Sequence, residues 1–252
     1  MIRQAVIQAG GGGTRLRPVT LEIPKPLVPV QGLPILTWQA RWFARHGVER
    51  ILVIIPPRWQ GAFEKWRDDL IPLLTKERLG EVSIDLFPEP EPMGTMGAFV
   101  HELSDQLGDE PIFVTNGDEL KGLDLSALEA FHRRQRVTSE NYATTIALIE
   151  VPNPSDYGVA ELAGEYIKAF HEKPANPPSN FINSGLYVIE PKIFSEVSRD
   201  KKFLMLEKEL FPRLATEGRL GGCSLEGPWF DCGTMERWER AIKEWQEPTD
   251  QN

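Results

Sequence analysis

Apolar and polar positions alternate in two distinct ways through the first half of the chain. Short apolar runs predict strands over residues 2–8, 50–55, 82–87 and 111–115. Segments whose apolar residues recur at helical spacing predict helices from Pro34 to Gly47 and over residues 59–74, 95–107 and 124–136. This alternation is typical of an α/β fold with a mainly parallel sheet between two helical layers, whose ligands bind at the carboxyl ends of the strands.

The pattern changes after Tyr142, where strand-like runs follow one another with Pro and Asn clusters between them. Strands are expected over residues 144–151, 157–162, 166–171, 181–189 and 220–225, and helices over residues 204–214 and 236–245. We expect a single domain over residues 1–247. Its parts are a first half at 1–120, a β-rich half at 121–233, a closing helix at 234–247 and then a polar tail at 248–252.

Composition narrows the class of protein. A chain of 252 residues with 41% hydrophobic content can bury one sizeable core. The formal net charge of −9 disfavours a nucleic acid or an anionic membrane as partner, because the average field would repel either. No apolar run reaches the roughly 20 residues that span a bilayer, and the N-terminus lacks the layout of a signal peptide. We therefore expect a cytoplasmic protein, with Cys223 and Cys232 as reduced thiols.

A glycine-rich turn behind the first predicted strand is the strongest chemical signal in the chain. Four glycines, Gly10–Gly13, let backbone amides approach an anion, and Arg15, Arg17 and Lys25 add positive charge, so the segment predicts a triphosphate site. It is not a Walker loop, because Thr14 and Arg15 stand where Lys and Ser or Thr are required. It is not a dinucleotide fingerprint either, since Arg15 takes the place of the third glycine. The alternative is a flexible surface turn.

Two aspartates are candidate magnesium ligands. Asp118 follows the fourth predicted strand in an Asn-Gly-Asp tripeptide, and Asp231 lies in the WFDCGT segment before the last helix. Magnesium prefers oxygen ligands and is commonly held by one or two carboxylates together with substrate phosphates. Turn formation is an equally good interpretation of the tripeptide, and helix capping is the alternative for Asp231, although Thr234 is the better cap.

A second set of polar residues lies in the β-rich half. Glu172 and Lys173 close one predicted strand, and Asn183 opens the next. A lysine can hold a monophosphate, while an amide and a carboxylate can bind the hydroxyls of a sugar. Each of these residues by itself is more commonly a solvated lysine or a turn asparagine. The indication of a second substrate therefore rests on the occurrence of these residues together.

These motifs, taken in order, resemble those of the sugar-1-phosphate nucleotidylyltransferases, also called nucleotide-sugar pyrophosphorylases. The resemblance covers nearly the whole chain, and the glycine turn followed by PKPLVPV is its most specific part. The matching segments are GGxGTRLxPxT at 10–20, PKPLVPV at 24–30, GT at 94–95, GD at 117–118, YGV at 157–159, EKP at 172–174, NSG at 183–185, LEKELFP at 206–212 and WxDxGT at 229–234.

The resemblance implies a Rossmann-like fold and an enzyme in which a sugar 1-phosphate attacks the α-phosphorus of a nucleoside triphosphate and expels pyrophosphate. Residues 1–120 would then be the nucleotide-binding half and residues 121–233 the sugar-phosphate-binding half. Arg15 and Lys25 would be catalytic, and Asp118 and Asp231 would hold Mg²⁺. The implied nucleotide-binding residues are Ala9, Gly10, Gly11, Gly13, Thr14, Arg15, Gly94, Thr95, Asn116 and Gly117, and the implied sugar-phosphate-binding residues are Gly158, Glu172, Lys173 and Asn183.

The sequence says less about which subclass of these enzymes the chain resembles. No hexapeptide repeat follows Thr234, so a stand-alone catalytic domain is expected. The LEKELFP segment is similar to that of guanylyltransferases for mannose or heptose 1-phosphate and of muramate uridylyltransferases. GTP is therefore favoured, with UTP, dTTP and CTP left open, as is a homo-oligomer. Two other functions are retained as alternatives: a cytidylyltransferase for a non-sugar phosphate such as phosphocholine, and a catalytically silent nucleotide-binding subunit.

Overall fold

The computed structural model describes residues 1–248, which divide into two compact units. The unit that we call the glycine-turn unit comprises Arg3–Glu91, Thr115–Leu123 and the chain from Gly227. The β-rich unit comprises Met1–Ile2, Pro92–Val114 and Asp124–Glu226. Apart from Pro248, the expected polar tail at 248–252 lies outside the described residues.

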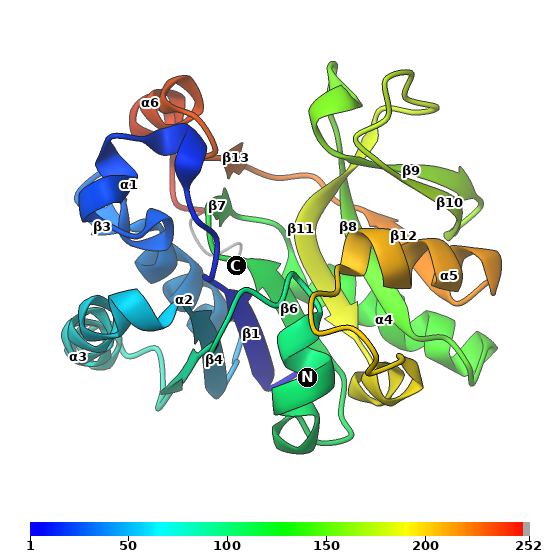
Figure 1. Ribbon diagram of the computed structural model, residues 1–252, viewed down its shortest axis with the longest axis horizontal. Coiled ribbons are helices and arrows are strands. Elements are labelled where there is room, and N and C mark those ends of the chain that lie inside the picture. The colour runs from blue at the N-terminus through cyan, green and yellow to red at the C-terminus, as the bar shows by residue number, and fades with distance from the viewer. Residues whose placement is uncertain (249–252) are drawn as a thin grey trace. The chain divides into compact units, whose positions relative to one another are not determined.

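Three parallel strands organise the glycine-turn unit (Figure 1). Their order is β5 (Ser83–Pro88), β4 (Arg50–Ile55) and β1 (Gln4–Gln8), with β4 in the middle. The middle strand is buried along almost its whole length, which agrees with its continuous apolar run. The helices α2 (Ile35–Arg45) and α3 (Gln60–Lys76) pack against each other, and α3 also packs against β5. The alternating pattern predicts parallel strands of this kind for the first half of the chain.

The glycine-turn unit also contains a set of short elements and the last helix of the chain that the structure describes. They are η1 (Thr14–Leu16), α1 (Val19–Glu22), η2 (Lys25–Leu27), β2 (Pro29–Val30), β3 (Leu33–Pro34), η3 (Pro57–Trp59), β7 (Glu119–Lys121), β13 (Trp229–Asp231) and α6 (Met235–Glu244). Among them, β7 and β13 form an antiparallel two-stranded ribbon.

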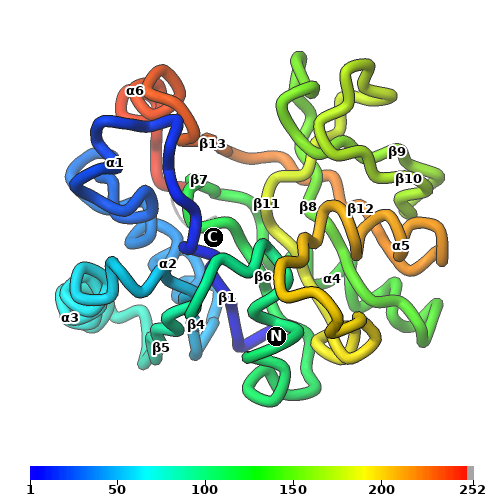
Figure 2. Tube along the Cα trace, viewed as in Figure 1, coloured from blue at the N-terminus to red at the C-terminus, as the bar shows by residue number. Residues whose placement is uncertain are grey.

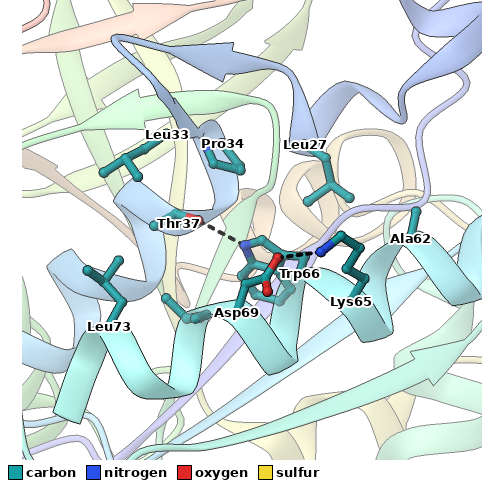
Figure 3. A pocket seen from close by; sticks show the side chains of 10 residues that line it. Leu27, Leu33, Pro34, Thr37, Ala62, Lys65, Trp66, Asp69 and Leu73 are labelled. Carbon is teal, nitrogen blue, oxygen red and sulfur yellow. Dashed lines mark hydrogen bonds and ion pairs between the residues drawn. The ribbon is translucent and has the colours of Figure 1, made fainter. Parts of the chain in front are cut away.

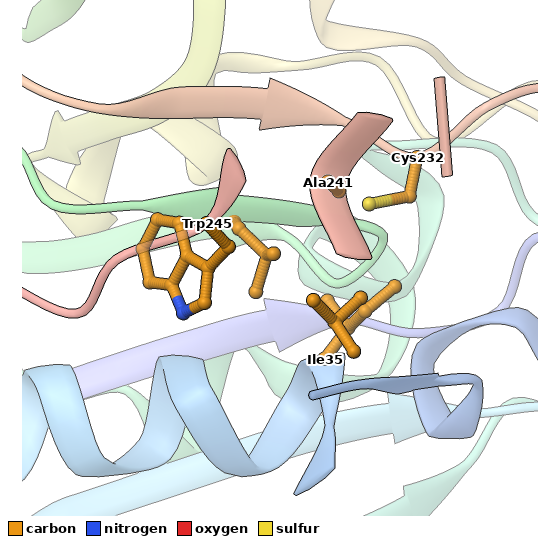
Figure 4. Packing of buried hydrophobic residues seen from close by; sticks show 6 residues of the cluster. Ile35, Cys232, Ala241 and Trp245 are labelled. Carbon is orange, nitrogen blue, oxygen red and sulfur yellow. The ribbon is translucent and has the colours of Figure 1, made fainter. Parts of the chain in front are cut away.

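A compact apolar cluster fixes the last helix to this unit (Figure 4). Ile35 comes from the start of α2, Ala241 and Trp245 come from α6 and the residue that follows it, and Cys232 comes directly after β13. All four side chains are at most 3% exposed. Burying a large apolar side chain stabilises the fold by about 1.5–3 kcal/mol, so this cluster anchors the end of β13 firmly.

The β-rich unit is built on a mixed sheet (Figure 2). Its strand order is β11-β8-β12-β10-β9, in which only β8 and β12 run parallel. The strands are β8 (Thr144–Glu150), β9 (Gly158–Ala163), β10 (Tyr166–Glu172), β11 (Phe181–Ile189) and β12 (Leu220–Ser224). The helical elements are η4 (Phe99–Leu103), η5 (Ser104–Gln106), α4 (Leu125–Thr138), η6 (Pro154–Asp156), η7 (Pro191–Glu196), η8 (Leu206–Leu210) and α5 (Phe211–Thr216). Strand β6 (Ile112–Asn116) crosses the boundary between the two units.

Three sequence expectations need correction. The helix expected over 95–107 is instead the π-helix η4 followed by the 3-10 turn η5, because its start is fastened to the 202–204 segment through Met96 N and Leu204 O at 2.9 Å. The helix expected over 204–214 begins as the π-helix η8 and becomes α5 only from Phe211. The helix expected from Pro34 begins at Ile35, since Pro34 belongs to β3. Within residues 1–248, no helix combines the length and apolarity needed to cross a bilayer.

Candidate active site

The glycine turn leaves the end of β1, and Gly13 is the position in it where a side chain would not fit. The Ala9 N–H donates to Ile54 O at 2.8 Å, which holds the turn at the carboxyl end of β4. Gly13 has a φ of 60°, and a Cβ there would lie 2.9 Å from Thr20 Cγ2. The Thr20 hydroxyl donates to Gly13 O at 2.7 Å, so the turn is closed from behind by a side chain.

A second glycine brings the next strand against this turn. The Gly117 N–H donates to Gln8 O at 2.9 Å, and a Cβ on Gly117 would lie 2.9 Å from that same oxygen. Asn116 and Gly117 therefore lie directly beside the end of β1. The two turns therefore meet at the carboxyl ends of their strands.

Lys25 and Asp118 form the central ion pair of the glycine-turn unit. Lys25 lies at the start of η2 with its side chain 7% exposed, and its Nζ donates to Asp118 Oδ2. Burial alone would lower the pKa of Lys25, but the charge of Asp118 and its hydrogen bond outweigh it and raise the pKa above the usual value. Burial would likewise raise the pKa of Asp118, yet Lys25 holds it below its usual range. Both groups are therefore charged at neutral pH.

The β7–β13 ribbon brings the two candidate metal ligands together. Asp231 is paired with Glu119 in the ribbon register, and Cys232 N donates to Asp118 O at 3.4 Å. Asp118 and Asp231 therefore lie on adjacent chain segments, although 113 residues separate them in sequence. Three-residue strands are too short for a hydrophobic pattern to predict, which is why the sequence gives no sign of the ribbon.

Arg15 and Arg237 complete the charged group around Asp231. Arg237 Nη1 donates to Asp231 Oδ2 at 2.5 Å. A Cβ on Gly233 would lie 2.6 Å from Asp231 Oδ1 and 3.3 Å from Arg15 Nη2. Gly233 thus leaves open the space that these two side chains share. The sequence analysis did not name Arg237 as a site residue. The signal that could have indicated it is its place in the first turn of the helix that Thr234 caps, close behind Asp231 in the chain.

A buried ion pair behind Asp118 is the other feature that the sequence candidates lack. Lys121 Nζ lies 2.6 Å from Glu119 Oε2, and both residues are at most 9% exposed. Burial, with the negative charges of Asp118 and Asp231 added, raises the pKa of Glu119 to about 7. Gln39 fixes this segment from α2 by donating to Glu119 O at 2.6 Å.

The donor set fits a hard divalent cation. Asp118 and Asp231 offer carboxylate oxygens, the ligand type that Mg²⁺ prefers. Among residues 1–248, no group of three or more His, Cys, Asp or Glu side chains could hold a metal ion. A magnesium ion here would thus take its remaining ligands from substrate phosphates and water, which is the usual pattern for phosphate-bound Mg²⁺.

The remaining nucleotide candidates lie in the β-rich unit. Gly94 has a φ of 77°, and a Cβ there would lie 2.3 Å from Leu204 O. The Thr95 hydroxyl donates to Glu207 Oε2 at 2.6 Å and accepts from Leu206 N at 2.9 Å. Desolvation raises the pKa of the Glu207 carboxyl. The Gly94-Thr95 pair is therefore fastened to the LEKELFP segment.

The four sugar-phosphate candidates lie together at one place in the mixed sheet. Gly158 pairs with Glu172 in the β9–β10 register, and a Cβ on Gly158 would lie 3.2 Å from Glu172 Oε2. Lys173 Nζ is 3.6 Å from Glu172 Oε1. Asn183 Nδ2 donates to the Tyr187 hydroxyl at 2.8 Å, while Asn183 Oδ1 accepts from Gly185 N at 2.8 Å, which fixes the orientation of the amide. Strand β11 pairs with β9 through Ile182 and Val159, which are the chain neighbours of Asn183 and Gly158.

A pocket of about 270 Å³ between α2 and α3 lies apart from the charged group described above (Figure 3). Its walls are mainly apolar. Its two charged residues, Lys65 and Asp69, are paired with each other at 3.0 Å, and Trp66 Nε1 donates to Thr37 Oγ1 at 2.9 Å. The pocket has none of the candidate phosphate or metal residues in its lining.

Comparison with protein families agrees with the geometry. The family model described as "Nucleotidyl transferase" matches residues 4–247. The chain belongs to this family. The match includes the glycine turn, the charged group around Asp118 and Asp231, and the sugar-phosphate candidates.

Curated relatives of this nucleotidyl transferase are named as guanylyltransferases. The chain is 35% identical over 237 residues to "Mannose-1-phosphate guanylyltransferase catalytic subunit beta" of Xenopus tropicalis, covering 91% of this chain and 61% of the relative. It is 33% identical over 244 residues to "Mannose-1-phosphate guanylyltransferase" of Mycobacterium tuberculosis, covering 94% of this chain and 62% of that protein. The chain thus spans about three-fifths of the length of these relatives.

Solved structures show the same α/β fold at low identity. A putative glucose-1-phosphate thymidylyltransferase from Bacillus anthracis matches with a TM-score of 0.71 at 24% identity, covering 95% of this chain and 94% of that one. A UDP-glucose pyrophosphorylase from Acinetobacter baumannii matches with a TM-score of 0.76 at 23% identity, covering 96% of this chain and 92% of that one.

Proposed function

We propose that this nucleotidyl transferase moves a nucleoside monophosphate, with GTP as the favoured donor, onto a sugar 1-phosphate and releases pyrophosphate. The observation that carries the proposal is the group of two cations and two carboxylates, Arg15, Lys25, Asp118 and Asp231, beside the glycine turn. Mannose 1-phosphate is the first sugar substrate to test, since it appears in the names of the relatives.

The chemistry asks the protein for alignment and charge neutralisation. The sugar phosphate is already an anionic nucleophile, so the enzyme needs no nucleophilic side chain of its own. Amides of the glycine turn would bind the triphosphate, and Arg15 and Lys25 would stabilise the charge that develops on the α-phosphate and on the leaving pyrophosphate.

Magnesium, held by Asp118 and Asp231, would neutralise phosphate charge when it is bound. The ion pairs to Lys25 and Arg237 orient both carboxylates in advance. Nucleotide binding by Ala9, Gly94, Thr95 and the Asn116-Gly117 turn is part of the same proposal.

In the β-rich unit, Lys173 would hold the phosphate of the sugar substrate, while Glu172, Asn183 and the backbone at Gly158 would bind its hydroxyls. The pre-oriented amide of Asn183 and the side-chain-free backbone at Gly158 support these roles. We also retain as proposals one domain over residues 1–247, a three-layer Rossmann-like fold with a mainly parallel central sheet, and a cytoplasmic location.

The test is pyrophosphate release from GTP, UTP, dTTP, CTP and ATP against mannose 1-phosphate, glucose 1-phosphate, a heptose 1-phosphate and phosphocholine, with and without Mg²⁺. We expect metal-dependent release with GTP and a sugar 1-phosphate. Release only with CTP and phosphocholine would favour the cytidylyltransferase instead. Nucleotide binding with no release in any combination would identify a silent subunit, a function that the retained cations and carboxylates argue against.

A further inference from the structure

One buried glutamine lies against the turn that carries Asp118 and has no part in the chemistry proposed above. Gln39 comes from the middle of α2 and is 1% exposed. Its Nε2 donates to Asn116 O at 2.8 Å and to Glu119 O at 2.6 Å. These two carbonyls stand on either side of Gly117 and Asp118, so one side-chain amide closes both ends of the turn between β6 and β7.

The two hydrogen bonds that this amide donates explain why the position is polar. Gln39 Oε1 is buried and finds no hydrogen-bond donor among residues 1–248. An unpaired buried acceptor costs about 1–3 kcal/mol, a cost that an apolar side chain would avoid. Reversing the amide would not help, because Oε1 would then face two carbonyl oxygens that only accept hydrogen bonds. The glutamine therefore acts here through its donors.

The helix that carries this glutamine is itself fixed on the glycine-turn unit. Ile35, one turn earlier in α2, belongs to the apolar cluster that anchors the end of β13. Trp42, about one turn later, donates from Nε1 to Leu123 O at 3.1 Å. Helix α2 therefore holds the chain segment from Asn116 to Leu123 at both of its ends. The backbone of Asp118 is fixed in this way, while its side chain is 37% exposed.

We propose that Gln39 is a positioning residue for the metal site, which fixes the turn so that the Asp118 carboxylate can serve Mg²⁺ and Lys25. The inference rests on the proposed function, because it takes Asp118 as a metal ligand. A site of this kind needs its ligands held within about 0.5 Å of the productive geometry. Removing a group that orients a ligand typically lowers metal affinity about 10- to 100-fold. Without the two donors the turn can shift, so metal binding should weaken although no ligand is lost.

The decisive measurement is binding of α,β-methylene GTP by isothermal titration calorimetry, with Mg²⁺ and with EDTA, in the absence of sugar phosphate. The analogue carries carbon in place of the bridging oxygen, so pyrophosphate cannot leave. Gln39→Met keeps the length of the side chain and removes both donors. We expect Mg²⁺ to strengthen binding of the analogue to the wild type. This gain should fall about 10- to 100-fold in Gln39→Met, while the affinity in EDTA stays within about threefold of the wild type.

The matched control is Thr37→Val, from the same helix. Thr37 is 4% exposed and accepts a hydrogen bond from Trp66 Nε1 at 2.9 Å, so this variant also leaves a buried polar partner unpaired. That hydrogen bond joins α2 to α3 rather than to the Asp118 turn, and the gain from Mg²⁺ should be unchanged. Urea titration should show a similar loss of folding free energy in Thr37→Val and Gln39→Met, which separates positioning from general stability.

A folded Gln39→Met that keeps the full gain from Mg²⁺ would overturn the inference, as would an equal loss of that gain in Thr37→Val. In the wild type, the side-chain amide protons of Gln39 should exchange slowly with solvent by NMR, and more slowly still with Mg²⁺ and the analogue bound. Exchange at the rate of an exposed glutamine, or a rate that Mg²⁺ leaves unchanged, would overturn the inference even if Gln39→Met does not fold. A wild type without any gain from Mg²⁺ would do so too, whereas a failure of the transferase proposal would be seen separately, in the pyrophosphate assay.

Discussion

Replacing Lys25 by Met removes one cation from the centre of the charged group while keeping a stem of similar length. The side chain is 7% exposed and pairs with Asp118, so its charge is held in place before substrate binds. Removing one such preorganised group typically costs about 3 kcal/mol of transition-state stabilisation, or roughly 100- to 200-fold in kcat. The cost in folding is smaller, at about 1–2 kcal/mol, because Asp118 is 37% exposed and water can replace part of the lost partner.

The assay is steady-state pyrophosphate release with GTP and the best sugar 1-phosphate, together with urea denaturation of each protein. The control is Lys65→Met, which removes a lysine of the same unit that is 78% exposed and should leave kcat unchanged. A Lys25→Met protein that is folded and turns over within threefold of the wild type would refute the assigned role. A rise in KM with kcat unchanged would refute it too, because the expected loss is in kcat.

Three further results are expected. Gly233→Ala places a Cβ 2.6 Å from Asp231 Oδ1, the proposed metal ligand, and should lower kcat at least tenfold. Gly61→Ala, which has open space around it, should leave kcat unchanged, and equal kcat values for the two variants would contradict the site geometry. Thr95→Val should lower the free energy of unfolding by about 1–2 kcal/mol in urea titrations, since Glu207 loses its donor, and Thr95→Ser should restore it. Burial lowers the pKa of His132 in the folded protein, despite the glutamate that accepts a hydrogen bond from it. The unfolded chain therefore binds a proton at this histidine more readily than the folded chain does. The stability that His132 contributes is present above about pH 6.5 and is lost as the pH falls below it. Urea midpoints at pH 7.5 and 5.5 should therefore drop more for wild type than for His132→Asn, and equal drops would exclude His132 as the cause.

The parts of the site that the sequence predicts are those with local signatures. The glycine turn can be recognised because Gly13 adopts a positive φ beside Thr20, a restriction that acts within a few residues. The Asn116-Gly117 turn is equally local, and its contact with β1 follows from the general rule for parallel strands. Thr234 as the cap of α6 is confirmed for the same reason.

The parts that the sequence does not reveal depend on long-range pairing. Glu119 and Lys121 form a short, mostly charged segment whose burial depends on β13, which lies more than 100 residues further along the chain. The partnership of Arg237 with Asp231 needs α6 to be anchored through Ala241 and Trp245. Residues 95–107 were expected as one α-helix because their apolar spacing is helical, and only the contacts with the 202–204 segment change their geometry.

By itself the sequence determined the alternation of strands and helices, the position of the glycine turn and the identity of the charged groups, because each depends on backbone preference or on residue type over a few positions. Only the tertiary structure decided that Lys25 neutralises Asp118, that Arg237 holds Asp231, and that Gln39 closes the Asp118 turn. Lys25 with Asp118 and Gln39 with the ends of that turn join segments that are distant in the chain, and Arg237 meets Asp231 only because α6 is packed against the end of β13. The two ion pairs draw their energy from bringing opposite charges together in a partly buried place. Such pairs form only after strand order and helix packing have brought the segments side by side.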